Sequence, residues 1–206
     1  MTLAAVVAGA IAQLVAWWFV SARGRSVWTA SAPVLAVAGA VAIVLDPPLS
    51  GREPVAIAAL VGVGTGLALY GGTRVFVAIV LGRWTEFGRH AAAIYRGRGA
   101  LRPWLVFAAA GVVAIGEEVF WRGLTQRELA GRLGAGSLGA VATWVAYVVA
   151  NAPSRNLAIL AGAIVGGAVW GALALWSGGV LASVASHVAW TMLMIAFPVV
   201  ERERAS

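Results

Sequence analysis

Three charged residues interrupt an apolar, helix-forming stretch. The segment "VVAIGEEVFWRGL", residues 112–124, carries Glu117, Glu118 and Arg122. Residues four apart share a helix face, so Glu118 and Arg122 are predicted to form an ion pair. Adjacent residues point about 100° apart, which leaves Glu117 without a local partner. A lone carboxylate in an apolar site suits a general base or acid. The alternative is a polar cluster in which all three residues tie helices together.

Two further apolar stretches carry polar residues one helical turn apart. Tyr147 and Asn151 share a face of "YVVAN", and His187 and Thr191 share a face of "ASHVAWTM". A histidine in a membrane helix meets no water, so it usually faces a partner or a functional site, and hydrogen bonding between helices is the alternative. Because three separate stretches each offer polar side chains, we predict that they converge on one site. The other histidine, His90, lies among arginines and is expected to be solvated.

The composition indicates a membrane protein. Hydrophobic residues make up 61% of the chain and charged residues 11%, whereas an ordinary soluble domain has about 25% charged residues. Several apolar stretches reach or approach the ~20 residues that cross a bilayer as a helix. They predict an all-α, polytopic transmembrane helix bundle of about seven spans, at 3–20, 27–45, 55–70, 104–120, 138–149, 157–175 and 179–199. The sequence has no cysteine, which excludes disulfides and thiolate chemistry.

One segment departs from this apolar pattern. Residues 73–102 mix arginines with apolar residues, which predicts an interfacial amphipathic segment or loop. We therefore expect N-terminal transmembrane helices over 1–72, this basic segment over 73–102, and core helices with the candidate site over 103–200. The net charge is +7, with the arginines mainly between the apolar stretches. This pattern favours the lipid bilayer as a partner and not nucleic acid. We predict a multi-pass protein of the cell (inner) membrane.

The polar motifs resemble those of the CPBP family of intramembrane proteases, which includes CAAX prenyl endopeptidases and bacteriocin-processing or Abi proteins. The resemblance rests on "GEEVFWRGL", then "YVVAN", then "GGVLASVASHVAWTM", within roughly residues 104–197. The marks of the family are an EExxxR helix, an FxxxH helix and a later HxxxN or HxxxD helix. The resemblance implies peptide hydrolysis in or near the membrane by an activated water, with no nucleophilic side chain and no cofactor or metal required.

The resemblance also implies a role for each matching residue. Glu117 would be the base that activates the water, and Glu118 and Arg122 would order the site. His187 would donate a hydrogen bond to the oxyanion of the tetrahedral intermediate. A single histidine among these candidates does not supply the usual three-ligand zinc site, so no metal is expected.

Two positions depart from the family pattern. The FxxxH element reads Tyr147-x-x-x-Asn151 here, and an asparagine can position a water but cannot accept a proton at neutral pH. All the base character would then fall on Glu117. The last element reads His187-x-x-x-Thr191, so a hydroxyl replaces the amide and can still donate one hydrogen bond.

Three functions follow from these residues. The first is a glutamic-type intramembrane endopeptidase that cuts a membrane-anchored protein or peptide, such as an anchoring helix in the manner of myxosortase-like members, or a bacteriocin. In a bacterial host, prenylated CAAX substrates are not expected. The second, favoured by Asn151, is a catalytically impaired membrane scaffold or binding protein. The third is a proton-coupled transporter that uses Glu117 and His187, and the lack of an inverted repeat argues against it.

Overall fold

A computed structural model describes residues 2–23, 27–46, 51–95 and 102–200 of the chain. Within these ranges the protein is helical and contains no strand, which confirms the predicted all-α class. The elements, in chain order, are α1 (Thr2–Arg23), α2 (Val27–Leu45), α3 (Val55–Leu81), α4 (Thr85–Ile94), α5 (Pro103–Glu118), η2 (Val119–Thr125), α6 (Gln126–Leu133), α7 (Gly136–Asn151), η3 (Ala152–Ser154), α8 (Leu157–Ser177) and α9 (Leu181–Ala196).

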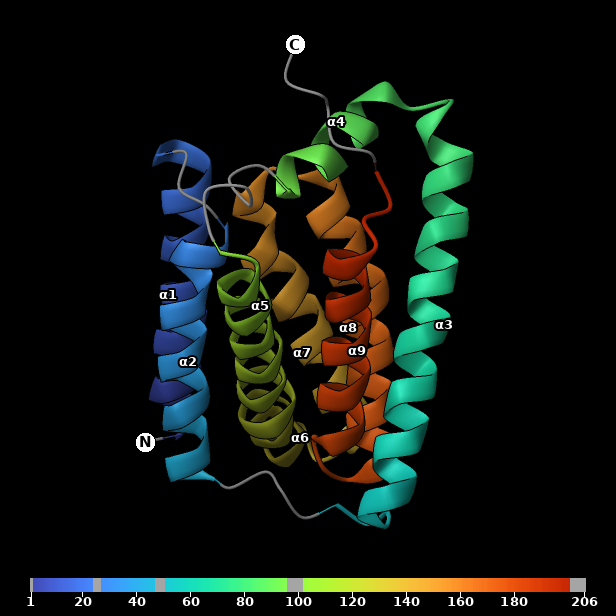
Figure 1. The fold of residues 1–206 in the computed structure, drawn as a ribbon. Coiled ribbons are helices and arrows are strands. Elements are labelled where there is room, and N and C mark those ends of the chain that lie inside the picture. The colour runs from blue at the N-terminus through green and yellow to red at the C-terminus, as the bar shows by residue number, and fades with distance from the viewer. Residues whose placement is uncertain (1, 24–26, 47–50, 96–101, 201–206) are drawn as a thin grey trace.

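The long helices stand side by side as an up-and-down bundle (Figure 1). In this view α1 and α2 form one side, α3 forms the opposite side, and α5, α7, α8 and α9 lie between them. Large apolar side chains point outward from the bundle; Val44 is 82% exposed, Leu60 73% and Val55 72%. Such faces suit contact with lipid tails, because no water is needed to satisfy them.

Length and composition mark several of these helices as membrane-spanning candidates. Four stretches qualify among the described residues: Thr2–Arg23, Val55–Leu81, Pro103–Leu133 and Leu157–Ser177. Two shorter apolar helices are Ala30–Leu45 and Leu181–Ala196. The structure thus agrees with a polytopic bundle, and the number of about seven spans stays a prediction.

Two helices are longer than their apolar stretches predicted. α3 continues past residue 70 to Leu81. Within this extension, Arg74 donates a hydrogen bond to the hydroxyl of Tyr70 at 3.0 Å. The helix that begins at Pro103 continues through the charged motif to Leu133, beyond the predicted end at residue 120. In both cases polar residues that ended the apolar pattern are paired within the protein, so the helix does not need to stop.

α4 lies across one end of the bundle and is amphipathic, as expected for part of the basic segment (Figure 1). It buries Phe87 and Ala91, which are one turn apart. His90 is not simply solvated: its Nδ1 accepts a hydrogen bond from the backbone N–H of Leu157 at 3.1 Å. Its backbone oxygen accepts one from Asn156, whose side chain also caps the first turn of α8. These contacts fix α4 to the start of α8.

Glycines on α3 allow it to pack closely against α9. A Cβ at Gly66 would lie 2.5 Å from the backbone oxygen of Ser186, and one at Gly62 would come closer still to that of Ala182. Small residues at four-residue spacing permit such contact between membrane helices. The approach matters for the site, because Ser186 directly precedes His187 on α9.

Candidate active site

The charged motif lies within one continuous helix. α5 ends at Glu118, and the π-helical turn η2 joins it to α6. All 7 residues of η2 are buried, including Arg122. π turns are rare and often occur at functional sites, because the extra residue changes the direction in which side chains point. The motif therefore runs through the interior of the bundle.

Glu118 is the centre of a buried charge cluster. Its Oε1 lies 3.2 Å from Nη1 of Arg122 and 2.9 Å from Nδ1 of His187. Nη2 of Arg122 donates to the backbone oxygen of Gly167 on α8 at 3.0 Å. The ion pair predicted from the spacing is thus confirmed, and the contact with His187 adds a link from α5 to α9. Buried charges are tolerated when they are paired in this way.

His187 is held on two sides. Glu118 contacts its Nδ1, and the ring of Trp170 stacks on the imidazole with centroids 3.6 Å apart and planes 13° apart. Since Nδ1 is engaged, Nε2 is the ring nitrogen left for chemistry in the adjoining pocket. It can donate a hydrogen bond when it carries a proton.

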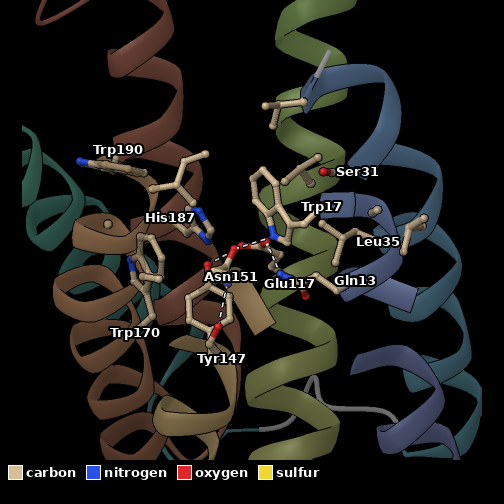
Figure 2. Close-up of a pocket in the computed structure, with 17 residues that line it drawn as sticks. Gln13, Trp17, Ser31, Leu35, Glu117, Tyr147, Asn151, Trp170, His187 and Trp190 are labelled. Atoms are coloured by element: carbon tan, nitrogen blue, oxygen red, sulfur yellow. Dashed lines mark hydrogen bonds between the residues drawn. The ribbon is translucent and has the colours of Figure 1, made fainter. Parts of the chain in front are cut away.

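Glu117 makes its hydrogen bonds to two other helices, α7 and α1. The hydroxyl of Tyr147 on α7 donates to its Oε2 at 2.7 Å, and Nε2 of Gln13 on α1 donates to its Oε1 at 3.4 Å (Figure 2). None of the ion pairs found in the described ranges includes Glu117. This carboxylate is therefore buried and hydrogen-bonded but not paired with a cation.

Glu117 and His187 line the same pocket, which has a volume of about 150 Å³ (Figure 2). Polar or aromatic side chains of four further helices complete its wall; they include Gln13, Trp17, Ser31, Tyr147, Asn151 and Trp170. One water needs only about 10–15 Å³ of such space, so the pocket can hold a water beside a peptide carbonyl.

Asn151 lies on the pocket wall, but its amide is engaged by the protein. Its Oδ1 accepts a hydrogen bond from the indole N–H of Trp17 at 3.0 Å, and its Nδ2 donates to the backbone oxygen of Tyr147 at 2.8 Å. Thr191 is not among the residues that line the pocket. Its buried hydroxyl has no hydrogen-bond partner in the part of the chain that the structure describes.

The structure therefore brings together most of the candidate residues. Glu117, Asn151 and His187 line one pocket. Glu118 contacts His187, and Arg122 pairs with Glu118. Thr191 is left outside this group.

Gln13 is a neighbour of Glu117 that sequence reasoning missed. Besides its contact with Glu117, its Oε1 accepts a hydrogen bond from the indole N–H of Trp121 at 2.8 Å. Both side chains are buried. The available signal was a single amide within the apolar stretch 3–20, which is costly in a membrane helix unless it finds a partner.

A second and larger pocket, called here the apolar pocket, adjoins the first. It has a volume of about 620 Å³ and lies among α3, α4, α8 and α9, with a wall that includes Leu69, Phe76, Phe87, Val165, Val169 and Met194. It shares Gly162, Trp170 and Trp190 with the pocket that holds Glu117 and His187. The hydroxyl of Thr73 on its wall already accepts a hydrogen bond from Trp190. The apolar pocket therefore offers mainly hydrophobic contact.

The described residues contain no group of three or more His, Cys, Asp or Glu side chains that could hold a metal ion.

Comparison with known proteins gives one finding. Residues 99–193 match the family model described as type II CAAX prenyl endopeptidase Rce1-like, which confirms the resemblance inferred from the motifs. No curated protein and no solved structure gives a match.

Proposed function

We propose that this chain, whose residues 99–193 match the family model of Rce1-like CAAX prenyl endopeptidases, is an intramembrane endopeptidase that uses a water activated by Glu117. One observation carries the proposal: Glu117 and His187, far apart in the chain, line a single pocket. A carboxylate without an ion pair can act as a base on water. A histidine beside it can stabilise the oxyanion that forms at the carbonyl.

In the proposed reaction, Oε1 of Glu117 removes a proton from water, and the water oxygen adds to the carbonyl carbon of the scissile peptide bond. The carbonyl oxygen becomes an oxyanion and accepts a hydrogen bond from Nε2–H of His187. In this step the imidazole carries a proton on both nitrogens, since Nδ1–H donates to Glu118. The C–N bond then breaks, and Glu117 returns the proton to the leaving nitrogen. Glu118 and Arg122 do not touch the substrate in this reaction; Glu118 holds the imidazole of His187, and Arg122 pairs with Glu118.

The substrate in this proposal is a membrane-anchored protein or peptide. Two features support this substrate class: the outward faces of the bundle are apolar, and the apolar pocket adjoins the pocket of Glu117 and His187. An apolar part of the substrate can occupy the larger space while its backbone reaches the smaller one. The proposed location is the cell (inner) membrane, which the protein crosses several times.

Asn151 supports a second candidate function, a catalytically impaired scaffold that binds a membrane segment without cutting it. Trp17 and the backbone of Tyr147 engage its amide, and an amide cannot take a proton from water. In that case Glu117 would bind a polar group of the partner and would not act as a base.

Cleavage of anchored substrates in liposomes tests the proposal. We expect the wild type to cleave and Glu117→Gln and His187→Ala to lose about 10²–10⁴-fold in kcat, the usual worth of an acid–base group. Glu128→Gln is the control, because Glu128 on α6 pairs with Arg132 and lines neither pocket. Wild-type cleavage by Glu117→Gln would eliminate Glu117 as the base. A wild type that cuts none of a broad substrate panel would favour the scaffold.

A further inference from the structure

The closest polar contact of the proposed base is with Tyr147, a residue to which the proposed function assigns no role. The Tyr147 hydroxyl lies 2.7 Å from Oε2 of Glu117, whereas Gln13 lies 3.4 Å from Oε1. Tyr147 is 5% exposed. An O–H donor at about 2.5–2.7 Å from a carboxylate belongs to the short and strong class of hydrogen bonds. Tyr147 is therefore the main group that fixes the orientation of this carboxylate.

The ring of Tyr147 is itself held in place. The guanidinium carbon of Arg122 lies 4.5 Å from the ring centroid, and the ring of Trp121 packs edge to face at 5.6 Å. Gly167 on α8 leaves room for the ring, since a Cβ there would lie 3.0 Å from Cδ1 of Tyr147. A ring confined in this way delivers its hydroxyl to a defined position.

Asn151 does not provide this support. Its amide hydrogen bonds go to Trp17 and to the backbone of Tyr147, and none of those found in the described chain reaches Glu117. The family motif at this position is FxxxH, and this chain has tyrosine and asparagine at the two positions. A hydroxyl is thus gained beside Glu117 at the phenylalanine position, one turn from the position where an imidazole is lost.

We infer that Tyr147 is a positioning residue for Glu117, because its hydroxyl makes the closest polar contact of this carboxylate, which the amide of Asn151 does not reach. This inference rests on the proposed function. By donating to Oε2, the hydroxyl fixes the carboxylate and leaves Oε1 to accept the proton of water. Tyr147 keeps its own proton throughout, so Glu117 alone carries the proton from water to the leaving nitrogen.

Tyr147→Phe tests the inference, because it removes the hydroxyl and keeps the ring between Arg122 and Trp121. A hydrogen bond to a charged group corresponds to about a 10- to 100-fold effect, so we expect kcat to fall by that factor. KM should stay close to that of the wild type. Tyr70→Phe is the matched control: its hydroxyl donates to the backbone oxygen of Phe197 at 3.0 Å, and it lines neither pocket.

Adding Asn151→His to Tyr147→Phe restores both residues of the family motif. We expect the double variant to regain about tenfold or more of the kcat that Tyr147→Phe alone loses, since an imidazole can again support the carboxylate and exchange a proton. If the hydroxyl of Tyr147 had only a structural role, an imidazole at position 151 would not restore kcat.

The outcomes separate the inference from the function on which it rests. If Glu117→Gln is inactive but Tyr147→Phe retains the kcat of the wild type, the inference is wrong and the function stands. If Glu117→Gln is as active as the wild type, the function itself fails. A loss in Tyr147→Phe that appears in KM and not in kcat, and that Asn151→His does not reverse, also overturns the inference.

Discussion

Arg122 is held by its two terminal nitrogens and by the flat face of its guanidinium. Nη1 pairs with Glu118, and Nη2 donates to the backbone of Gly167. The same group lies over the ring of Tyr147. A planar guanidinium can make these contacts together, whereas the ammonium of lysine is a compact point charge on a flexible stem. Arg122 therefore contacts both Glu118, which holds His187, and Tyr147, which donates to Glu117.

Arg122→Lys keeps the charge but loses this geometry. We expect kcat to fall about 10- to 100-fold, because each lost hydrogen bond to a charged group corresponds to roughly that factor. The thermal unfolding temperature in detergent should also fall. Arg132→Lys is the control, since Arg132 forms an exposed pair with Glu128 on α6, and such pairs contribute about 0–1 kcal/mol. Equal behaviour of the two variants would show that the guanidinium shape is not needed.

Spacing along a single helix made part of the site predictable. Glu118 and Arg122 are four residues apart, and this spacing predicted their ion pair. Glu117 is adjacent to Glu118, so its side chain was predicted to point in a different direction from the helix. The partners of Glu117 were not predictable in this way. Gln13 and Tyr147 reach it from α1 and α7, and their contacts depend on how separate helices pack. Nor does spacing indicate that the amide of Asn151 is already engaged by Trp17.

At the level of elements, the packing of α3 on α9 depends on backbone contact. Gly66 faces the backbone oxygen of Ser186, so any side chain there must push the two helices apart. Because Ser186 directly precedes His187, a shift of α9 also moves the imidazole relative to Glu118 and Trp170.

Gly66→Ala tests the role of this contact. The added Cβ would lie 2.5 Å from a backbone atom, and we expect a loss of about 1–3 kcal/mol in the free energy of unfolding, as for other overpacked sites. Activity should fall with it. Gly64→Ala on the same helix is the control, because nothing lies within 4 Å of a Cβ there. Denaturant unfolding of both variants decides the matter, and equal stabilities would contradict it.

The lengths of the elements show a second limit of sequence analysis. The hydropathy pattern predicted that the fourth apolar stretch ends at residue 120, but the helix continues to Leu133. Arg122 ended the apolar pattern, but inside the bundle it pairs with Glu118 and donates to the backbone oxygen of Gly167 on α8. Hydropathy scores a residue as if it faced lipid, and it therefore underestimates helices whose polar residues face inward.

At the level of the whole molecule, two pockets lie side by side within one bundle. The smaller pocket carries the polar candidates, and the apolar pocket offers about 620 Å³ of mainly hydrophobic space. Val165 lines the apolar pocket and is 57% exposed, so it lies on its open side. Ile164, its neighbour on α8, is 46% exposed and lines neither pocket.

Val165→Trp narrows the apolar pocket, and Ile164→Trp places the same ring on an adjacent surface of the helix. If the apolar pocket receives part of the substrate, we expect Val165→Trp to raise KM about 10-fold, since one poorly fitted apolar group corresponds to about 1–3 kcal/mol. Ile164→Trp should resemble the wild type in both constants. A KM that is unchanged in Val165→Trp would place the substrate elsewhere on the protein.

The indole of Trp170 lines both pockets. One face of the ring stacks on the imidazole of His187, and the same side chain forms part of the wall of the apolar pocket. In the proposed function, an apolar segment of the substrate in the larger pocket would contact the same indole that stacks on the imidazole. A segment that displaces the indole would also displace the imidazole, so selectivity among substrates would appear in kcat as well as in KM.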